Sequence, residues 1–237
     1  MKYLLLNLWI IIFFPSSVIG QNEEPSEDLK IKGRVAWFVY TSIPEGLENP
    51  VSIMSGDKII EVTLSKRSPS NPVKIPADGI LKIVRKVENT DKPEKPSYQI
   101  LAQALVPEGI SKALVILVPA AKNTSGLLFQ PKVKDLEIFK GGDSMYLNMT
   151  NLKVGVKLGE SNILINPGEN KIHKSTNNSE PTNVAVSYSY FHPEKNEWKV
   201  LSASTIVLYP TRREICIFSW DPRFKRMDYH GITLPVM

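Results

Sequence analysis

Cysteine and histidine are nearly absent from this chain of 237 residues, which contains one Cys and three His. One cysteine cannot form an internal disulfide, so an exported chain with this composition depends on a hydrophobic core. Cys216, His173, His192 and His230 show no metal-ligand spacing, and neither an Asp-rich calcium loop nor a phosphate-binding glycine pattern occurs. We therefore predict a protein with no metal site, no cofactor and no catalytic residue.

Long hydrophobic runs are also absent, except at the N-terminus. Lys2 is followed by a run of apolar residues from 4 to 14, broken only by Asn7, and then by small residues that include Gly20. This is the pattern of a secretory signal peptide, and the run is shorter than the ~20 residues of a spanning helix. We predict a signal peptide over 1–20, a polar disordered leader over 21–30, and an exported chain, periplasmic or extracellular, without a transmembrane span.

The charge of the exported part is small. Without Lys2 it carries 28 basic and 24 acidic side chains, which gives a net charge of +4. A balance this mild does not indicate a nucleic-acid-binding protein, and export makes nucleic acid a still poorer candidate partner.

No stretch has the 3.6-residue periodicity of an ordinary helix, because 18 prolines and 13 glycines interrupt the chain. Short runs of alternating apolar and polar residues recur instead, which is typical of a β-sandwich or barrel. We predict an all-β fold of two β-sandwich-like halves, mostly antiparallel, at 31–119 and 127–237. An alternative is that the two halves share one sheet system.

Three stretches give more specific expectations. The runs 31–41 and 113–118 are apolar on both faces, so their strands should lie centrally in a sheet. The segments 98–106 and 112–119 should form a hairpin, and 183–191 should pair antiparallel with 198–209. The segment 141–168 should form three successive strands joined by tight turns.

A basic segment from 212 to 226 is the first candidate binding site. Its aromatic member is Trp220 and its cations are Arg212, Arg213, Arg223, Lys225 and Arg226. Such a segment suits an envelope protein or an anionic cell-surface polymer. The alternative is a solvated strand edge, because Lys and Arg commonly protect exposed edges.

Two other groups of residues suggest different functions. Trp37, Trp198 and Trp220 could stack on sugar rings, which requires at least two of them exposed on one face; otherwise they fill the core. Gly142-Asp143-Ser144 resembles the GDS motif of the GDSL lipase-esterases, which implies Ser144 as nucleophile and His230 as its base. Here Met145 follows the motif, Asp228 and His230 are separated by one residue rather than two, and nothing indicates the parallel α/β fold of that family.

The run GRVAWFVYTS after the signal peptide and the pattern G-D-x-x-x-x-N-M-T…LG…PG at 142–168 are similar to uncharacterised exported β-rich proteins of bacterial cell envelopes. This resemblance carries no catalytic residue. The leading hypothesis is a non-catalytic envelope protein that acts as an interaction or scaffold module. The alternatives are a carbohydrate-binding or adhesion module and, less favoured, a Ser hydrolase.

Overall fold

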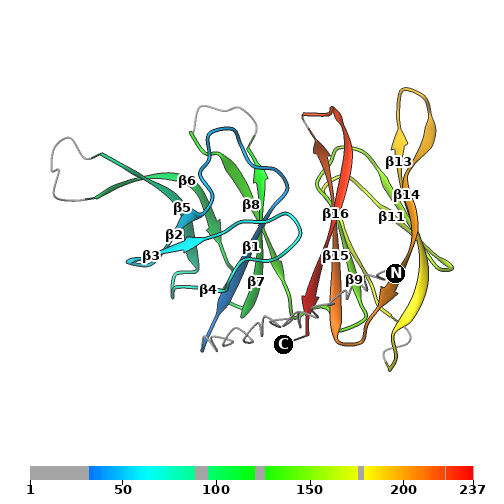
Figure 1. Cartoon of the computed structure of the whole chain (residues 1–237), viewed down its shortest axis with the longest axis horizontal. Helices are drawn as coiled ribbons and strands as arrows, with labels where there is room; N and C mark the ends of the chain where they lie inside the picture. The colour runs from blue at the N-terminus through cyan, green and yellow to red at the C-terminus, as the bar shows by residue number, and fades with distance from the viewer. Residues whose placement is uncertain (1–31, 89–95, 121–125, 176–178, 222, 237) are drawn as a thin grey trace, which may run out of the picture. The chain divides into compact units, whose positions relative to one another are not determined.

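The computed structural model describes residues 32–88, 96–120, 126–175, 179–221 and 223–236. Within these residues the fold is all-β, with no helix, and its sixteen strands form four four-stranded sheets (Figure 1). No helix in the described part is long and apolar enough to cross a membrane. The predicted signal peptide and leader lie outside the described residues.

The first half of the chain forms two sheets. Sheet A has the order β4 (Val73–Lys74), β1 (Val35–Tyr40), β7 (Lys112–Pro119), β8 (Phe129–Asp135). Sheet B has the order β3 (Lys58–Val62), β2 (Val51–Ser55), β5 (Ile80–Val87), β6 (Ser97–Leu105). All neighbours pair antiparallel except β1 and β7, which are parallel.

The second half repeats this arrangement strand for strand. Sheet C has the order β12 (Asn170–His173), β9 (Ser144–Asn148), β15 (Arg212–Asp221), β16 (Arg226–Pro235). Sheet D has the order β11 (Ser161–Ile165), β10 (Val154–Leu158), β13 (Thr182–His192), β14 (Glu197–Leu208). Again only one pair, β9 and β15, is parallel. Each half is thus an eight-stranded sandwich of the same topology, as the two-half prediction requires.

Three buried clusters show how the sheets pack. One joins sheets A and B, and another joins sheets C and D. A third joins A to C, and it includes Trp37 and Ile116 from the first half with Leu147 and Ile217 from the second. Sheets A and C are therefore covered on both faces, which explains why β1 and β7 are apolar on both sides. The halves have separate sheets but share this middle core.

The boundary between the halves differs from the sequence-based one. β8 pairs with β7 along its whole length, from Ala113–Asp135 to Pro119–Phe129, so the first sandwich extends to Asp135 rather than ending at 119. Residues 121–125 of the expected junction lie outside the described residues, and the chain before and after them leads to β7 and β8. Strand β16 occupies part of the tail that the sequence left unassigned.

One predicted local pairing is wrong. β6 and β7 do not form a hairpin, because β6 belongs to sheet B and β7 to sheet A. The segment 141–168 does give three strands, but β9 lies in sheet C while β10 and β11 lie in sheet D. The buried Asn148 stabilises this crossing, since its Nδ2 donates to the carbonyl oxygens of Leu152 at 2.7 Å, Asn166 at 3.1 Å and Ile165 at 3.2 Å. The predicted antiparallel pair of 183–191 with 198–209 is confirmed by β13 and β14.

Candidate ligand-binding site

The basic segment 212–226 does not form one surface. β15 separates Arg212 from Arg223 and its neighbours by ten residues of strand, about 30 Å. Arg213 is buried, with its guanidinium over the Phe139 ring at 5.3 Å. It donates to the carbonyl oxygens of Leu136 and Pro235, so it joins the segment between the halves to the end of β16. Arg213 is a structural residue, and burial lowers its pKa.

The remaining cations lie at opposite ends of the strand. Arg212 is exposed and its guanidinium lies 4.8 Å from the centre of the Tyr209 ring. At the other end Arg223 and Arg226 both stack on the exposed Phe224, each at 5.2 Å.

At this second end the structure brings Trp220, Lys225 and Arg226 together around a hollow of about 500 Å³. Tyr190 and His192 at the end of β13 and Glu194 of the β13–β14 turn form another part of its wall. Half of the predicted site residues therefore share one hollow, with Trp220 47% exposed. We refer to Trp220, Phe224, Lys225 and Arg226 as the basic hairpin tip.

The proposed hydrolase pair is not assembled. Ser144 lines the space between sheets C and D with Tyr146 and Cys216. Successive residues of β16 point to opposite faces of sheet C. His230 therefore lies on the face opposite to Gly231, together with Ile232 and Leu234, which pack against sheet A. Ser144 and His230 thus lie on opposite faces of one sheet. Cys216 does not replace Ser144 as a nucleophile, because burial raises the pKa of its thiol to about 12.

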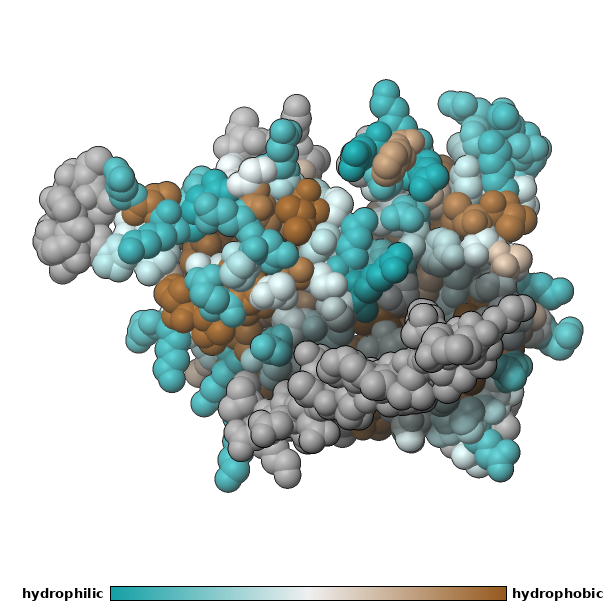
Figure 2. Space-filling model, viewed as in Figure 1, coloured by the Kyte–Doolittle hydropathy of each residue, from teal (hydrophilic) through white to brown (hydrophobic). Residues whose placement is uncertain are grey.

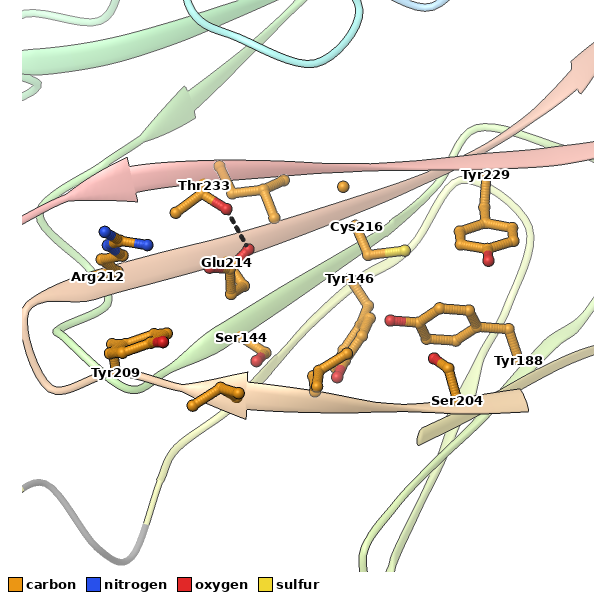
Figure 3. A pocket seen from close by; sticks show the side chains of 14 residues that line it. Ser144, Tyr146, Tyr188, Ser204, Tyr209, Arg212, Glu214, Cys216, Tyr229 and Thr233 are labelled. Carbon is orange, nitrogen blue, oxygen red and sulfur yellow. Dashed lines mark hydrogen bonds between the residues drawn. The ribbon is translucent and has the colours of Figure 1, made fainter. Parts of the chain in front are cut away.

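A cavity of about 470 Å³ opens between sheets C and D beside β14 and β16 (Figure 3). Its wall on β9 and β15 carries Ser144, Tyr146, Glu214 and Cys216. From the sequence alone, these four residues did not group into one site. β9 and β15 place them together because they pair in parallel, with Ser144 beside Glu214 and Tyr146 beside Cys216. Only this long-range pairing reveals the group.

The cavity is unusually polar for the interior of a sandwich. The oxygens of Ser144 and Tyr146 are buried without a hydrogen bond to any described residue. Figure 3 shows the hydroxyl of Tyr188 directed into the same space, and burial raises the pKa of both tyrosines. Buried hydroxyls without partners are costly, so those of Ser144 and Tyr146 are available to a bound molecule or to water, whereas the hydroxyl of Tyr188 interacts with the Cys216 thiol.

One carboxylate lies at the outer part of this cavity. Burial raises the pKa of Glu214, while a hydrogen bond from Thr233 and the charge of Arg212 act in the opposite direction. Thr233 Oγ1 donates to Glu214 Oε2 at 2.9 Å. Figure 3 shows Arg212 and Tyr209 at this same end, so the cavity runs from a charged entrance to an aromatic interior.

The matching strand of the first half has apolar side chains at these positions. The inward residues of β7 are Ala113, Val115 and Leu117, which belong to the apolar cluster between sheets A and B. Along β15 the corresponding residues are Glu214, Cys216 and Phe218, with Arg212 at the exposed end of the strand. On β16, a Cβ added to Gly231 would meet nothing within 4 Å, because the residue faces the open space. The topology alone therefore does not require the cavity.

The three tryptophans proposed as sugar-stacking residues lie in different environments. Trp37 is buried between sheets A and C, whereas Trp198 and Trp220 are about half exposed, at 48% and 47%. These two belong to different sheets and do not share a face. Among the described residues no cluster of His, Cys, Asp or Glu could hold a metal ion.

Comparison with known proteins adds no relative to this description. Neither a protein-family model nor a curated protein matches the chain.

Proposed function

We propose that the chain is an exported, non-catalytic protein of the bacterial cell envelope that acts as an interaction module. The observation that carries this proposal is the cavity between sheets C and D, where hydroxyl groups without partners face an open space. Among the described residues that line that space, no nucleophile is paired with a base, so the arrangement suits binding better than bond cleavage.

The comparison between the two halves supports a binding role for the second. A sandwich of this topology can close on an apolar core, as sheets A and B do. In the second half the same space holds the hydroxyls of Ser144 and Tyr146, at a cost in stability unless something pairs with them, and Glu214, which accepts a hydrogen bond from Thr233. A polar group of a partner that enters past Arg212 and Tyr209 would satisfy them.

The partner we propose is an envelope protein or an anionic cell-surface polymer. The basic hairpin tip offers a second contact for it, because Trp220 and Phe224 lie there beside Lys225 and Arg226. Exposed aromatic side chains next to cations are typical of protein-binding surfaces. Export and the small net charge argue against nucleic acid.

The test is cross-linking of the tagged full-length chain in its native envelope, followed by mass spectrometry of the recovered proteins. Gly231→Leu fills the cavity, and Gly109→Leu is the matched control, because Gly109 also has nothing near its added Cβ. We expect the control to recover the wild-type partner and Gly231→Leu to lose it while keeping a cooperative melting transition. Equal recovery by both variants would show that the cavity is not the contact.

Two further arms test the rest of the proposal. Arg226→Glu should weaken recovery of the partner if the basic hairpin tip contributes, and it leaves the cavity unchanged. Retention of an uncleaved N-terminus in the cytoplasm would contradict export, and turnover of a substrate that a single side-chain change abolishes would contradict a non-catalytic role.

A further inference from the structure

The outer face of sheet D, which faces away from sheet C, carries the aromatic pair Phe191 and Trp198. A row of neighbours runs across its four strands, from Leu164 on β11 through Gly155 and Ser189 to Val200 on β14. Trp198 extends from β14 over this row. An added Cβ at Gly155, two strands away, would lie 3.2 Å from Trp198 Cζ3 and 2.8 Å from Ser189 Oγ.

This reach means that the indole lies across the sheet rather than standing up from it. Gly155 and Ser189 leave the room beneath it, and Phe191 on β13 holds it from the side, with ring centres 5.6 Å apart and planes at 64°. Trp198 nevertheless remains 48% exposed. One face of the indole is therefore seated on the sheet and the other is presented outward.

The first half has the same row of positions, which a β-bulge allows us to align. In sheet B the pairing of β5 with β6 shifts between Ile83 and Val84. In sheet D the pairing of β13 with β14 shifts between Tyr188 and Ser189. This alignment sets Tyr98 against Trp198 and Ser52 against Gly155. The position of Ser189 is taken by Val84, a bulkier residue whose side chain is buried.

The loop that lies beside this row of residues also differs between the halves. In the first half β1 and β2 are joined by ten residues, and Leu47, Glu48 and Pro50 of this loop line the hollow beside Val84. Arg85 Nη2 donates to Gly46 O at 2.9 Å and so ties the loop there. In the second half only residues 149–153 join β9 and β10. This shorter connection contributes no residue to the hollow around Trp198 on this face of sheet D.

This face of sheet D contains a shallow hollow of about 350 Å³ beside the indole. Its other polar side chains are Lys157, Asn162 and Ser187, and Leu164 forms part of the rim. The hollow therefore offers a flat aromatic surface, an amide, hydroxyls and one ammonium group. A sugar ring has the complementary chemistry, because its C–H face packs on an aromatic ring while its hydroxyls bond to amides and hydroxyl groups.

We infer that the outer face of sheet D binds a saccharide chain, with one sugar ring stacked on Trp198 and its hydroxyl groups bonded to Asn162, Ser187 and Lys157. This site is separate from the cavity, because it lies on the opposite face of the same sheet. A single cation does not suit a polyphosphate, and the exposed side of the Trp198 indole leaves space for a ring beside Ser187.

The experiment is native-gel affinity electrophoresis of the purified chain in glycol chitin, hydroxyethylcellulose, xylan, laminarin and alginate, with co-sedimentation on purified peptidoglycan sacculi. We expect at least one polysaccharide to bind, and Trp198→Ala to weaken that binding about tenfold or more, equivalent to about 1.4 kcal/mol. Trp198→Phe should retain part of it. Tyr98→Ala, the matched change in the first half, should bind as wild type does.

A second variant tests the seating of the ring without removing it. Gly155→Ala places a methyl group against the indole and Ser189, so we expect it to tilt Trp198 and weaken binding while thermal melting stays cooperative. Failure of every polysaccharide and of sacculi to bind would overturn the inference, as would undiminished binding by Trp198→Ala. Binding to sacculi alone identifies the cell's own wall as the source, and binding to soluble polysaccharides alone identifies an external glycan.

The outcome is independent of the proposed interaction partner. Trp198→Ala should recover the same cross-linked protein as the wild type, whereas Gly231→Leu should bind polysaccharide normally.

Discussion

His230 is expected to make this protein acid-sensitive. Its ring is buried on the face of sheet C that packs against sheet A, and neither ring nitrogen has a hydrogen-bond partner among the described residues. Burial lowers its pKa to about 4, assisted by the positive charges of Lys66 and Arg67 and opposed by Asp228. Lys66 Nζ lies 3.7 Å from Asp228 Oδ2, so the nearby acid is already engaged with a cation.

The sign of the effect follows from which state binds the proton. The unfolded chain protonates His230 near its ordinary pKa of about 6.5, whereas the folded chain resists protonation until about pH 4. The free energy of unfolding is therefore highest above pH 6.5 and falls as the pH drops toward 4. The full effect is about 3 kcal/mol, at about 1.4 kcal/mol for each pKa unit, and about 2 kcal/mol of it is lost by pH 5.

The assay is thermal unfolding of wild type and His230→Leu at pH 7 and pH 5, compared as a difference. For a chain of this size a loss of 2 kcal/mol lowers Tm by about 4–8 °C. Between pH 7 and pH 5 the Tm of the wild type should fall by about 4–8 °C more than the Tm of His230→Leu. The variant is needed because Glu214, with its raised pKa, stabilises the fold at acid pH and acts in the opposite direction. Parallel pH dependence in the two proteins would refute the reasoning about His230.

Three other substitutions test the packing, and a fourth, Arg212→Ala, serves as a control. Arg213→Ala removes two hydrogen bonds from a buried guanidinium and should cost about 2–4 kcal/mol in urea unfolding, whereas Arg212→Ala, at an exposed site, should cost less than about 0.5 kcal/mol. Gly231→Val adds apolar atoms to open space in a strand and should raise the free energy of unfolding by about 1 kcal/mol; destabilisation would argue against the cavity. Gly141→Ala should destabilise by at least about 2 kcal/mol, because its Cβ would fall on the carbonyl oxygen of Pro210, and a wild-type melting curve would contradict that close approach.

The candidate sites could be found from sequence only in fragments. The segment 212–226 identified Trp220, Lys225 and Arg226, which do share a hollow, but it also included the buried Arg213. A charged residue in an alternating strand gives no sign of whether another sheet covers it. Trp198 was recognised as a possible sugar-stacking residue, but its seat on Gly155 depends on strands paired across the sheet. The cavity was missed because Ser144 and Glu214 are seventy residues apart in the chain.

The sequence by itself determined the all-β class and the division into two halves. Alternation with period two, frequent Pro and Gly, and runs such as 113–118 that are apolar on both faces follow from local chemistry and central burial. Only the tertiary structure decided which strands share a sheet. Alternation says which side chains share a face of a strand but not which strand lies beside it, so β6 and β7 separate into different sheets although they are consecutive. The parallel pairs β1–β7 and β9–β15 each bring together two strands that are buried on both faces. Together these pairs form the core shared by the two halves, and β9–β15 also forms a wall of the polar cavity.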